Sequence, residues 1–180
     1  QYKKQINNFI KKKDKVFVFI GSFTTSFDFN PLLKIADESF KKKWNIKFIF
    51  CGYNECFFLL KKKYSNNNKT LFLESTNFTT NKYIASKSNA TLAPYKNFFD
   101  FNNSIPNKIY DYLSFNKKII TSLKGETRRY LKCNDAGKFY NNFNELKEIL
   151  LKSKFKKQNF SRIILQEKFK YKELLKIISQ

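Results

Sequence analysis

The sequence predicts an α/β domain with a doubly wound parallel sheet, Rossmann-like and of about six strands. Short runs of apolar β-formers alternate along the chain with segments in which apolar residues recur at helical spacing. The first run, 16–20, is continuously apolar, as expected for a strand buried on both faces of a parallel sheet. The 180 residues have the length of one domain and are enough to bury a core.

The helix between the first two strands has the clearest end signals. Asn30 at the cap position and Pro31 at the first helical position predict its start. The lysine triplet 41–43 predicts its end, because cations complement the helix macrodipole there. Glycines close both flanking strands, at Gly21 and Gly52.

The other elements follow from the same periodicities. The predicted strands are 16–20, 46–51, 70–74, 90–93, 118–121 and 138–140. The predicted helices are 30–43, 55–63, 79–87, 105–116, 126–133 and 144–152. Residues 95–104 predict an irregular aromatic loop, Gly137 a turn, and Asn144 the cap of the last of these helices.

Composition divides the chain into a polar lead-in over 1–15, the Rossmann-like domain over 15–152, and Lys-rich helices over 153–180. The chain opens on Gln1 without an initiator Met, so we expect a fragment of a longer protein. No apolar run reaches the roughly 18 residues that a membrane span needs, and no signal peptide is present. We therefore expect a cytoplasmic location.

The formal net charge is +22, and only three of the 36 basic residues are Arg. One explanation is an AT-rich genome, whose codons favour Lys, Asn, Ile, Phe and Tyr. The other is a polyanionic partner, either nucleic acid or an anionic membrane. Because surfaces dedicated to phosphate favour the forked donors of Arg, we favour the first explanation and do not expect nucleic acid as the partner.

The chain has no His, which excludes Ser-His-Asp and Cys-His mechanisms and His-containing zinc sites. Cys51, Cys56 and Cys133 are odd in number and form no Cys-x-x-Cys, so neither a disulfide framework nor a zinc ribbon is predicted. We expect buried free thiols in a reducing compartment. The sequence indicates no metal site and identifies no catalytic residue.

The helix predicted over 105–116 carries the candidate binding residues. The chain enters it through Ser104 and Pro106, its first turn exposes backbone N–H groups, and Lys108 adds a cation, which together suit a phosphate. Asp111, at i+3 from Lys108, suits the two hydroxyls of a ribose. The same spacing also fits a capped surface helix with a Lys–Asp pair worth about 0.2–0.5 kcal/mol.

Several segments in a fixed order carry a family resemblance. They are Phe19-Ile20-Gly21-Ser22, Phe48-Ile49-Phe50-Cys51-Gly52, Leu71-Phe72-Leu73, 86–94, Pro106-Asn107-Lys108-Ile109-Tyr110-Asp111-Tyr112-Leu113, Lys118-Ile119-Ile120-Thr121-Ser122, Gly125-Glu126, and Gly137 with Tyr140 and Glu145-Leu146. Over about residues 15–152 the chain resembles the C-terminal, donor-binding half of a GT-B fold. The resemblance is to retaining family 4 glycosyltransferases of bacterial surface polysaccharide synthesis.

The resemblance implies roles for seven residues. Asp111 takes the place of the family's ribose-binding Glu. The residues implied around the donor diphosphate are Ser104, Pro106, Asn107, Lys108, Gly21 and Ser22. The chain departs from the family at Asn103, where a first acidic residue is usual, and over 21–33, where no cation occurs.

The function that the resemblance implies is sugar transfer from a UDP- or GDP-linked donor to a saccharide or lipid-linked acceptor in surface polysaccharide synthesis. The acceptor-binding N-terminal GT-B domain is missing from this chain, so we expect the fragment alone to be inactive. No cofactor beyond the nucleotide-sugar and no metal is expected. The Lys-rich tail suits an anionic leaflet, which implies a peripheral position on the inner membrane.

Three alternatives stay open at this point. A basic α/β domain that binds nucleic acid would show binding with a steep dependence on salt. A GT-B relative that epimerises nucleotide-sugars would rely on carboxylates and His, and this chain has no His. A degenerate domain kept for protein interaction would bind no nucleotide.

Overall fold

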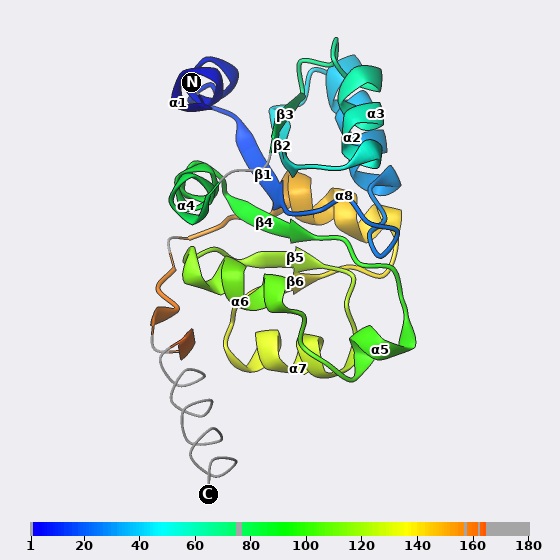
Figure 1. Ribbon diagram of the computed structural model, residues 1–180, viewed down its shortest axis with the longest axis vertical. Coiled ribbons are helices and arrows are strands. Elements are labelled where there is room, and N and C mark those ends of the chain that lie inside the picture. The colour runs from blue at the N-terminus through cyan, green and yellow to red at the C-terminus, as the bar shows by residue number, and fades with distance from the viewer. Residues whose placement is uncertain (1, 75–76, 157, 162, 165–180) are drawn as a thin grey trace, which may run out of the picture.

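The structure is a computed structural model that describes residues 2–74, 77–156, 158–161 and 163–164. Within them, six strands form one sheet in the order β3-β2-β1-β4-β5-β6 (Figure 1). The strands are β1 (Lys15–Ile20), β2 (Ile46–Gly52), β3 (Thr70–Glu74), β4 (Ala90–Ala93), β5 (Ile119–Thr121) and β6 (Gly137–Phe139). All neighbouring strands are parallel, which confirms the predicted doubly wound α/β class.

Helices cover both faces of this sheet. They are α1 (Tyr2–Phe9), α2 (Asn30–Lys41), α3 (Glu55–Lys63), α4 (Phe78–Ser86), α5 (Phe99–Asn102), α6 (Asn107–Ser114), α7 (Gly125–Cys133) and α8 (Phe143–Lys152). Figure 1 shows α2, α3 and α8 on one face and α4, α6 and α7 on the other. Strand order reverses between β1 and β4, which is the topological switch point where open α/β sheets generally bind ligands.

The continuous apolar runs are buried as predicted. Every residue of β2 is buried, and in β1 only Lys15 is partly exposed. At the end of β1 the ring of Phe19 makes edge-on contacts with Phe23, Phe27 and Phe29, at centroid distances of 4.8–5.1 Å. These rings attach the loop 21–29 to the sheet without any regular secondary structure.

Three predicted local signals were wrong by one or two residues. Phe29, not Asn30, is the cap residue of α2, and the Asn30 N–H donates to Asp28 Oδ1 at 3.1 Å. Asn142, not Asn144, caps α8, accepting the Glu145 N–H at 3.0 Å. Gly137 is the first residue of β6 rather than a turn.

The residues after α8 correct a larger prediction. A Lys-rich helix was predicted from Lys154, yet 153–156 and 158–160 are not helical. Phe155 packs edge-on against Phe17 at 5.7 Å, and the N–H of buried Phe160 donates to Asn116 Oδ1 at 2.7 Å. Burial of these two aromatic side chains outweighs helix propensity here. Residues 165–180 lie outside the described residues, and the predicted boundaries at 15 and 152 stay predictions.

A buried ion pair lies at the amino end of the sheet. Lys47 Nζ is 3.0 Å from Asp14 Oδ2, and the two side chains are only 9% and 6% exposed. The same ammonium group donates to the carbonyl of Phe9, and Asp14 also accepts the Lys11 N–H at 2.7 Å. The pair thus joins α1 and the turn after it to β2.

Other lysines in the described part of the chain also donate to backbone carbonyls. They are Lys15 to Leu151, Lys69 to Trp44, Lys108 to Ile20 and Lys117 to Ser88. Burial lowers the pKa of Lys69, Lys108 and Lys117. Part of the large positive charge is therefore structural rather than a solvated surface.

The three cysteines differ in exposure. Cys51 is buried as predicted, but Cys56 and Cys133 are exposed, and none of the three forms a disulfide with a described residue. Cys56 and Cys133 lie on the solvent-facing sides of α3 and α7, so neither belongs to the core. Among the described residues, no helix is long and apolar enough to cross a bilayer, and no group of three potential metal ligands forms.

Candidate functional site

The glycine loop after β1 makes an unusually close backbone approach. Gly21 has φ +138°, a backbone conformation that residues other than glycine rarely adopt. A Cβ at Gly21 would collide with Lys108 Nζ, and a Cβ at Gly52 would lie 2.5 Å from the Gly21 carbonyl oxygen. The ends of β1 and β2 and the start of α6 therefore meet at glycines, and the structure brings predicted residues Gly21 and Lys108 together.

Lys108 points back toward the sheet rather than into solvent. Its ammonium group donates to the Ile20 carbonyl. It also lies over the rings of Phe19 and Phe27, 4.5 and 5.3 Å from their centroids. Burial lowers the pKa of Lys108 to about 8, and nearby Asp111 opposes that shift.

Tyr112 is a site residue for which the sequence pattern predicted only a core position. Its hydroxyl accepts the Ile20 N–H at 3.0 Å and donates to the Ile20 carbonyl at 3.3 Å. Burial raises the pKa of this hydroxyl, so it stays protonated. Lys108 and Tyr112 are one helical turn apart, and both fix the start of α6 against the last residue of β1. The sequence offers one indication of this role for Tyr112, namely an aromatic ring with a hydroxyl group four residues after Lys108.

Replacing Tyr112 with Phe leaves the buried Ile20 N–H without its acceptor. We expect a loss of about 1–3 kcal/mol in the free energy of unfolding, measured by urea denaturation. Tyr83→Phe is the matched control, since its hydroxyl makes only an exposed contact of 3.4 Å with Asn7. Equal stabilities of the Tyr112→Phe and Tyr83→Phe proteins would contradict the role given to Tyr112.

The entry to α6 differs from the predicted one. The helix begins at Asn107, two residues later than predicted, and Pro106 takes the cap position without any side-chain hydrogen bond. The Ser104 hydroxyl donates to the Asp100 carbonyl at 2.8 Å, because the loop predicted to be irregular contains α5. The Ser104 side chain therefore binds back to α5, which ends at Asn102, and does not cap α6.

The other predicted residues lie nearer to solvent. Asn107 is exposed at the first position of α6, and Ser22 is half-buried after Gly21. Asp111 is exposed, and burial of part of its carboxyl group raises its pKa against the opposing effect of Lys108. None of the ion pairs between described residues joins Lys108 to Asp111, so the alternative of a surface Lys–Asp pair is wrong.

A polar pocket of about 490 Å³ lies at the carboxyl edge of the sheet. We call it the carboxyl-edge pocket. Its lining includes Asp28, Tyr95, Lys96, Ser122, Lys124 and Tyr140. These residues come from the loops after β1, β4, β5 and β6. No residue predicted from the sequence as a donor contact lines this pocket.

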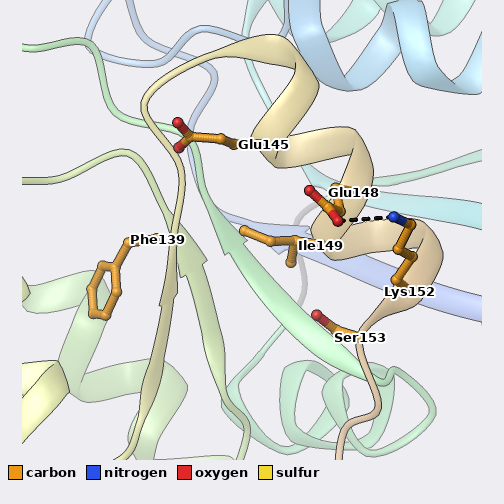
Figure 2. A pocket seen from close by; sticks show the side chains of 6 residues that line it. All are labelled: Phe139, Glu145, Glu148, Ile149, Lys152 and Ser153. Carbon is orange, nitrogen blue, oxygen red and sulfur yellow. Dashed lines mark hydrogen bonds and ion pairs between the residues drawn. The ribbon is translucent and has the colours of Figure 1, made fainter.

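A second pocket, of about 350 Å³, lies between α8 and edge strand β6 and is shown in Figure 2. Its charged groups are already paired. Glu148 forms an ion pair with Lys152 at 2.9 Å, and Glu145 accepts the Asn141 N–H at 2.7 Å. These contacts stabilise α8 and its start, so the pocket has a structural explanation.

Most of the chain matches a known protein family. The family model described as "Glycosyl transferases group 1" matches residues 2–160. No curated protein matches the chain by sequence.

Solved structures with the same fold are distant in sequence. WaaG, a glycosyltransferase involved in lipopolysaccharide biosynthesis, is 14% identical with a TM-score of 0.61, over 84% of this chain and 40% of that one. Sucrose-phosphate synthase from Thermosynechococcus elongatus is 13% identical with a TM-score of 0.64, over 97% and 48%. UDP-GlcNAc 2-epimerase from Methanocaldococcus jannaschii is 14% identical with a TM-score of 0.55, over 93% and 49%. The chain thus spans less than half of each protein, and the likeness is one of fold.

Proposed function

This chain belongs to the family of group 1 glycosyl transferases, and we propose that it binds the donor of a sugar-transfer reaction, a sugar linked to UDP or GDP. One observation carries the proposal. Lys108, Gly21 and the start of α6 meet at the carboxyl end of β1, where the strand order reverses, and no side chain caps α6. A cation, close backbone and free helix N–H groups at a topological switch point suit a diphosphate.

The proposed donor contacts follow from this arrangement. The N–H groups of Asn107 and Lys108 bind the diphosphate beside the Lys108 ammonium group, which the Ile20 carbonyl holds against Gly21, and Pro106 fixes the entry angle of the helix. Gly21 and Ser22 line the opposite wall. Ser104 contributes through its backbone position, because its hydroxyl is held by Asp100.

Asp111 is proposed to bind the ribose. It lies one turn along α6 from the first N–H groups, a rise of about 5 Å, which matches the step from a diphosphate to its ribose. Its carboxylate is exposed and accepts hydrogen bonds from two neighbouring hydroxyls without rearrangement of the helix.

The remaining parts of the reaction lie outside this chain. We propose that a further GT-B domain binds the acceptor, a saccharide or lipid-linked saccharide of surface polysaccharide synthesis, and that the fragment alone transfers no sugar. The role of WaaG in lipopolysaccharide biosynthesis supports this class of pathway. The proposal includes no metal and no cofactor beyond the nucleotide-sugar, and it places the protein in the cytoplasm at the inner membrane.

Thermal-shift titration with UDP, GDP and their sugars tests donor binding. At 100 Kd of the right nucleotide we expect about 2.7 kcal/mol of added stability, which is a rise of about 5–10 °C in Tm. Asp111→Ala should lose most of that rise, because the ribose hydroxyls lose their acceptor. Asp100→Ala is the matched control, a nearby exposed carboxylate on α5 outside the proposed site.

Two outcomes would overturn the proposal or part of it. A chain that melts cooperatively but shows no shift with any nucleotide does not bind a donor by itself. A shift of equal size in the Asp111→Ala and Asp100→Ala proteins would move the ribose away from Asp111.

A further inference from the structure

The carboxyl-edge pocket is separated from the proposed donor site by two aromatic rings. Phe27 lies under the Lys108 ammonium, 5.3 Å from ring centroid to nitrogen. The Tyr95 ring lies 4.5 Å from Phe27, and residues 27 and 95 also pair as an isolated β-bridge. Tyr95 then lines the pocket on its other side. A ligand in the pocket is therefore a neighbour of one held at Lys108.

The pocket is polar and carries a positive balance. Lys96 and Lys124 line it, against a single acidic residue, Asp28. Helices α2, α7 and α8 all begin at its rim, so the positive ends of three helix dipoles add to the same field. An anionic group in this pocket is favoured over a cation.

The rest of the lining suits hydroxyl groups. The amide side chain of Asn97 lines the pocket beside the rings of Tyr95 and Tyr140, together with Asn141 and Asn142, whose amides are also hydrogen-bonded to Glu145. Amides both donate and accept hydrogen bonds, and an aromatic ring packs against the apolar C–H face of a sugar. The volume of about 490 Å³ lies within the range of small-molecule sites and exceeds what a bare phosphate needs.

The pocket walls are also held in place before any ligand arrives. The Ser122 hydroxyl donates to the Tyr95 carbonyl, and Tyr140 is hydrogen-bonded to Ser122. Both tyrosines are only 7% exposed. Such fixed side chains lower the entropic cost of binding.

We infer that the carboxyl-edge pocket binds a hexose that carries a phosphate group, with the phosphate at Lys96 and Lys124 and the ring of the sugar against Tyr95 and Tyr140. The inference rests on the proposed function, since two sources of this chemistry exist in a sugar-transfer reaction. One is the glycosyl phosphate end of the donor, and the other is a phosphate-linked sugar of the acceptor.

Calorimetric titration with glucose 1-phosphate tests the pocket, with inorganic phosphate and methyl glucoside as separate probes. We expect glucose 1-phosphate to bind at least tenfold more tightly than either part alone. The double variant Lys96→Gln, Lys124→Gln should weaken it at least tenfold. The matched control is Lys62→Gln, Lys63→Gln, which removes two exposed lysines from α3 and should change nothing.

Three results would overturn the inference: no binding of glucose 1-phosphate, equal affinity for inorganic phosphate, or unchanged affinity in the Lys96, Lys124 variant. Competition identifies the source. Displacement of glucose 1-phosphate by the nucleotide-sugar assigns the pocket to the donor, and simultaneous binding assigns it to the acceptor. The Lys96, Lys124 variant should still bind UDP or GDP, so failure of the pocket is distinguishable from failure of the donor site.

Discussion

Replacing Lys108 with Met should weaken binding of the nucleoside diphosphate by about 10- to 150-fold. The ammonium group is the cation that the structure places at the end of β1, where it already contacts the Ile20 carbonyl and lies against Gly21. A hydrogen bond to a charged group is worth about 1.5–3 kcal/mol, which corresponds to that range of affinity. The measurement is the dissociation constant of UDP or GDP by calorimetry at pH 7.

The same lysine should make binding depend on pH. With a pKa of about 8, its protonated fraction falls from about nine tenths at pH 7 to about one tenth at pH 9. Affinity for the diphosphate should therefore fall by about tenfold across that interval, and the Lys108→Met protein should show a flat profile. Lys87→Met, an exposed lysine on another helix end, is the control and should keep the wild-type profile.

Stability should change in the opposite direction over a partly overlapping interval. The pKa of Lys108 is about 8 in the folded chain, against the ordinary value of 10.5 that applies once the chain unfolds. Between these values the unfolded chain binds more protons, so the contribution of Lys108 to stability rises with pH. An affinity that stays constant from pH 7 to pH 9, or a Lys108→Met protein that binds normally, would remove Lys108 from the site.

Asp14→Ala should produce the largest loss of stability among single changes outside the core, about 3–5 kcal/mol. The substitution leaves the ammonium group of Lys47 buried without a counter-charge. An unpaired buried charge lowers the free energy of unfolding more than the loss of both charges does. For a chain of this length the expected fall in Tm is about 6–20 °C. Thermal unfolding followed by circular dichroism measures it.

A second substitution separates the charge from the packing. In Asp14→Ala, Lys47→Met, no charge is left unpaired, so a large part of the lost stability should return. Asp135→Ala is the control for an exposed pair, since Asp135 is 85% exposed beside Lys118, and it should cost at most about 1 kcal/mol. A loss below about 1 kcal/mol for Asp14→Ala would show that Lys47 finds water or another partner.

The sheet was predictable because each of its strands can be recognised from its own run of apolar residues. Runs such as 16–20 and 46–51 are apolar for most of their length, and a strand buried on both faces needs that pattern. Helix starts were harder. Asn142 and Asn144 have the same cap propensity, and only Glu145, three residues after Asn142, marks the true cap, because its N–H donates to Asn142 Oδ1 and its carboxylate accepts the Asn142 amide.

The candidate site was predictable in part. Spacing and resemblance together selected Gly21 and Lys108, which the structure brings into contact although they lie far apart in the sequence. The direction of Lys108 and the role of Tyr112 were not predictable. Both depend on hydrogen bonds to the N–H and carbonyl groups of Ile20, which come close to α6 only in the folded sheet. Residues lining the carboxyl-edge pocket come from four separate loops, and no local pattern marks such a set.

The lysines that donate to backbone carbonyls have a consequence for chemical labelling. Among the described residues, Lys15, Lys47, Lys69, Lys108 and Lys117 donate to carbonyl oxygens, and an amine-reactive reagent has to compete with those contacts. The acylation rates at these five positions should therefore differ from those of solvated lysines. Mass spectrometry measures these rates residue by residue, and a diphosphate bound beside Lys108 should lower the acylation rate of that residue.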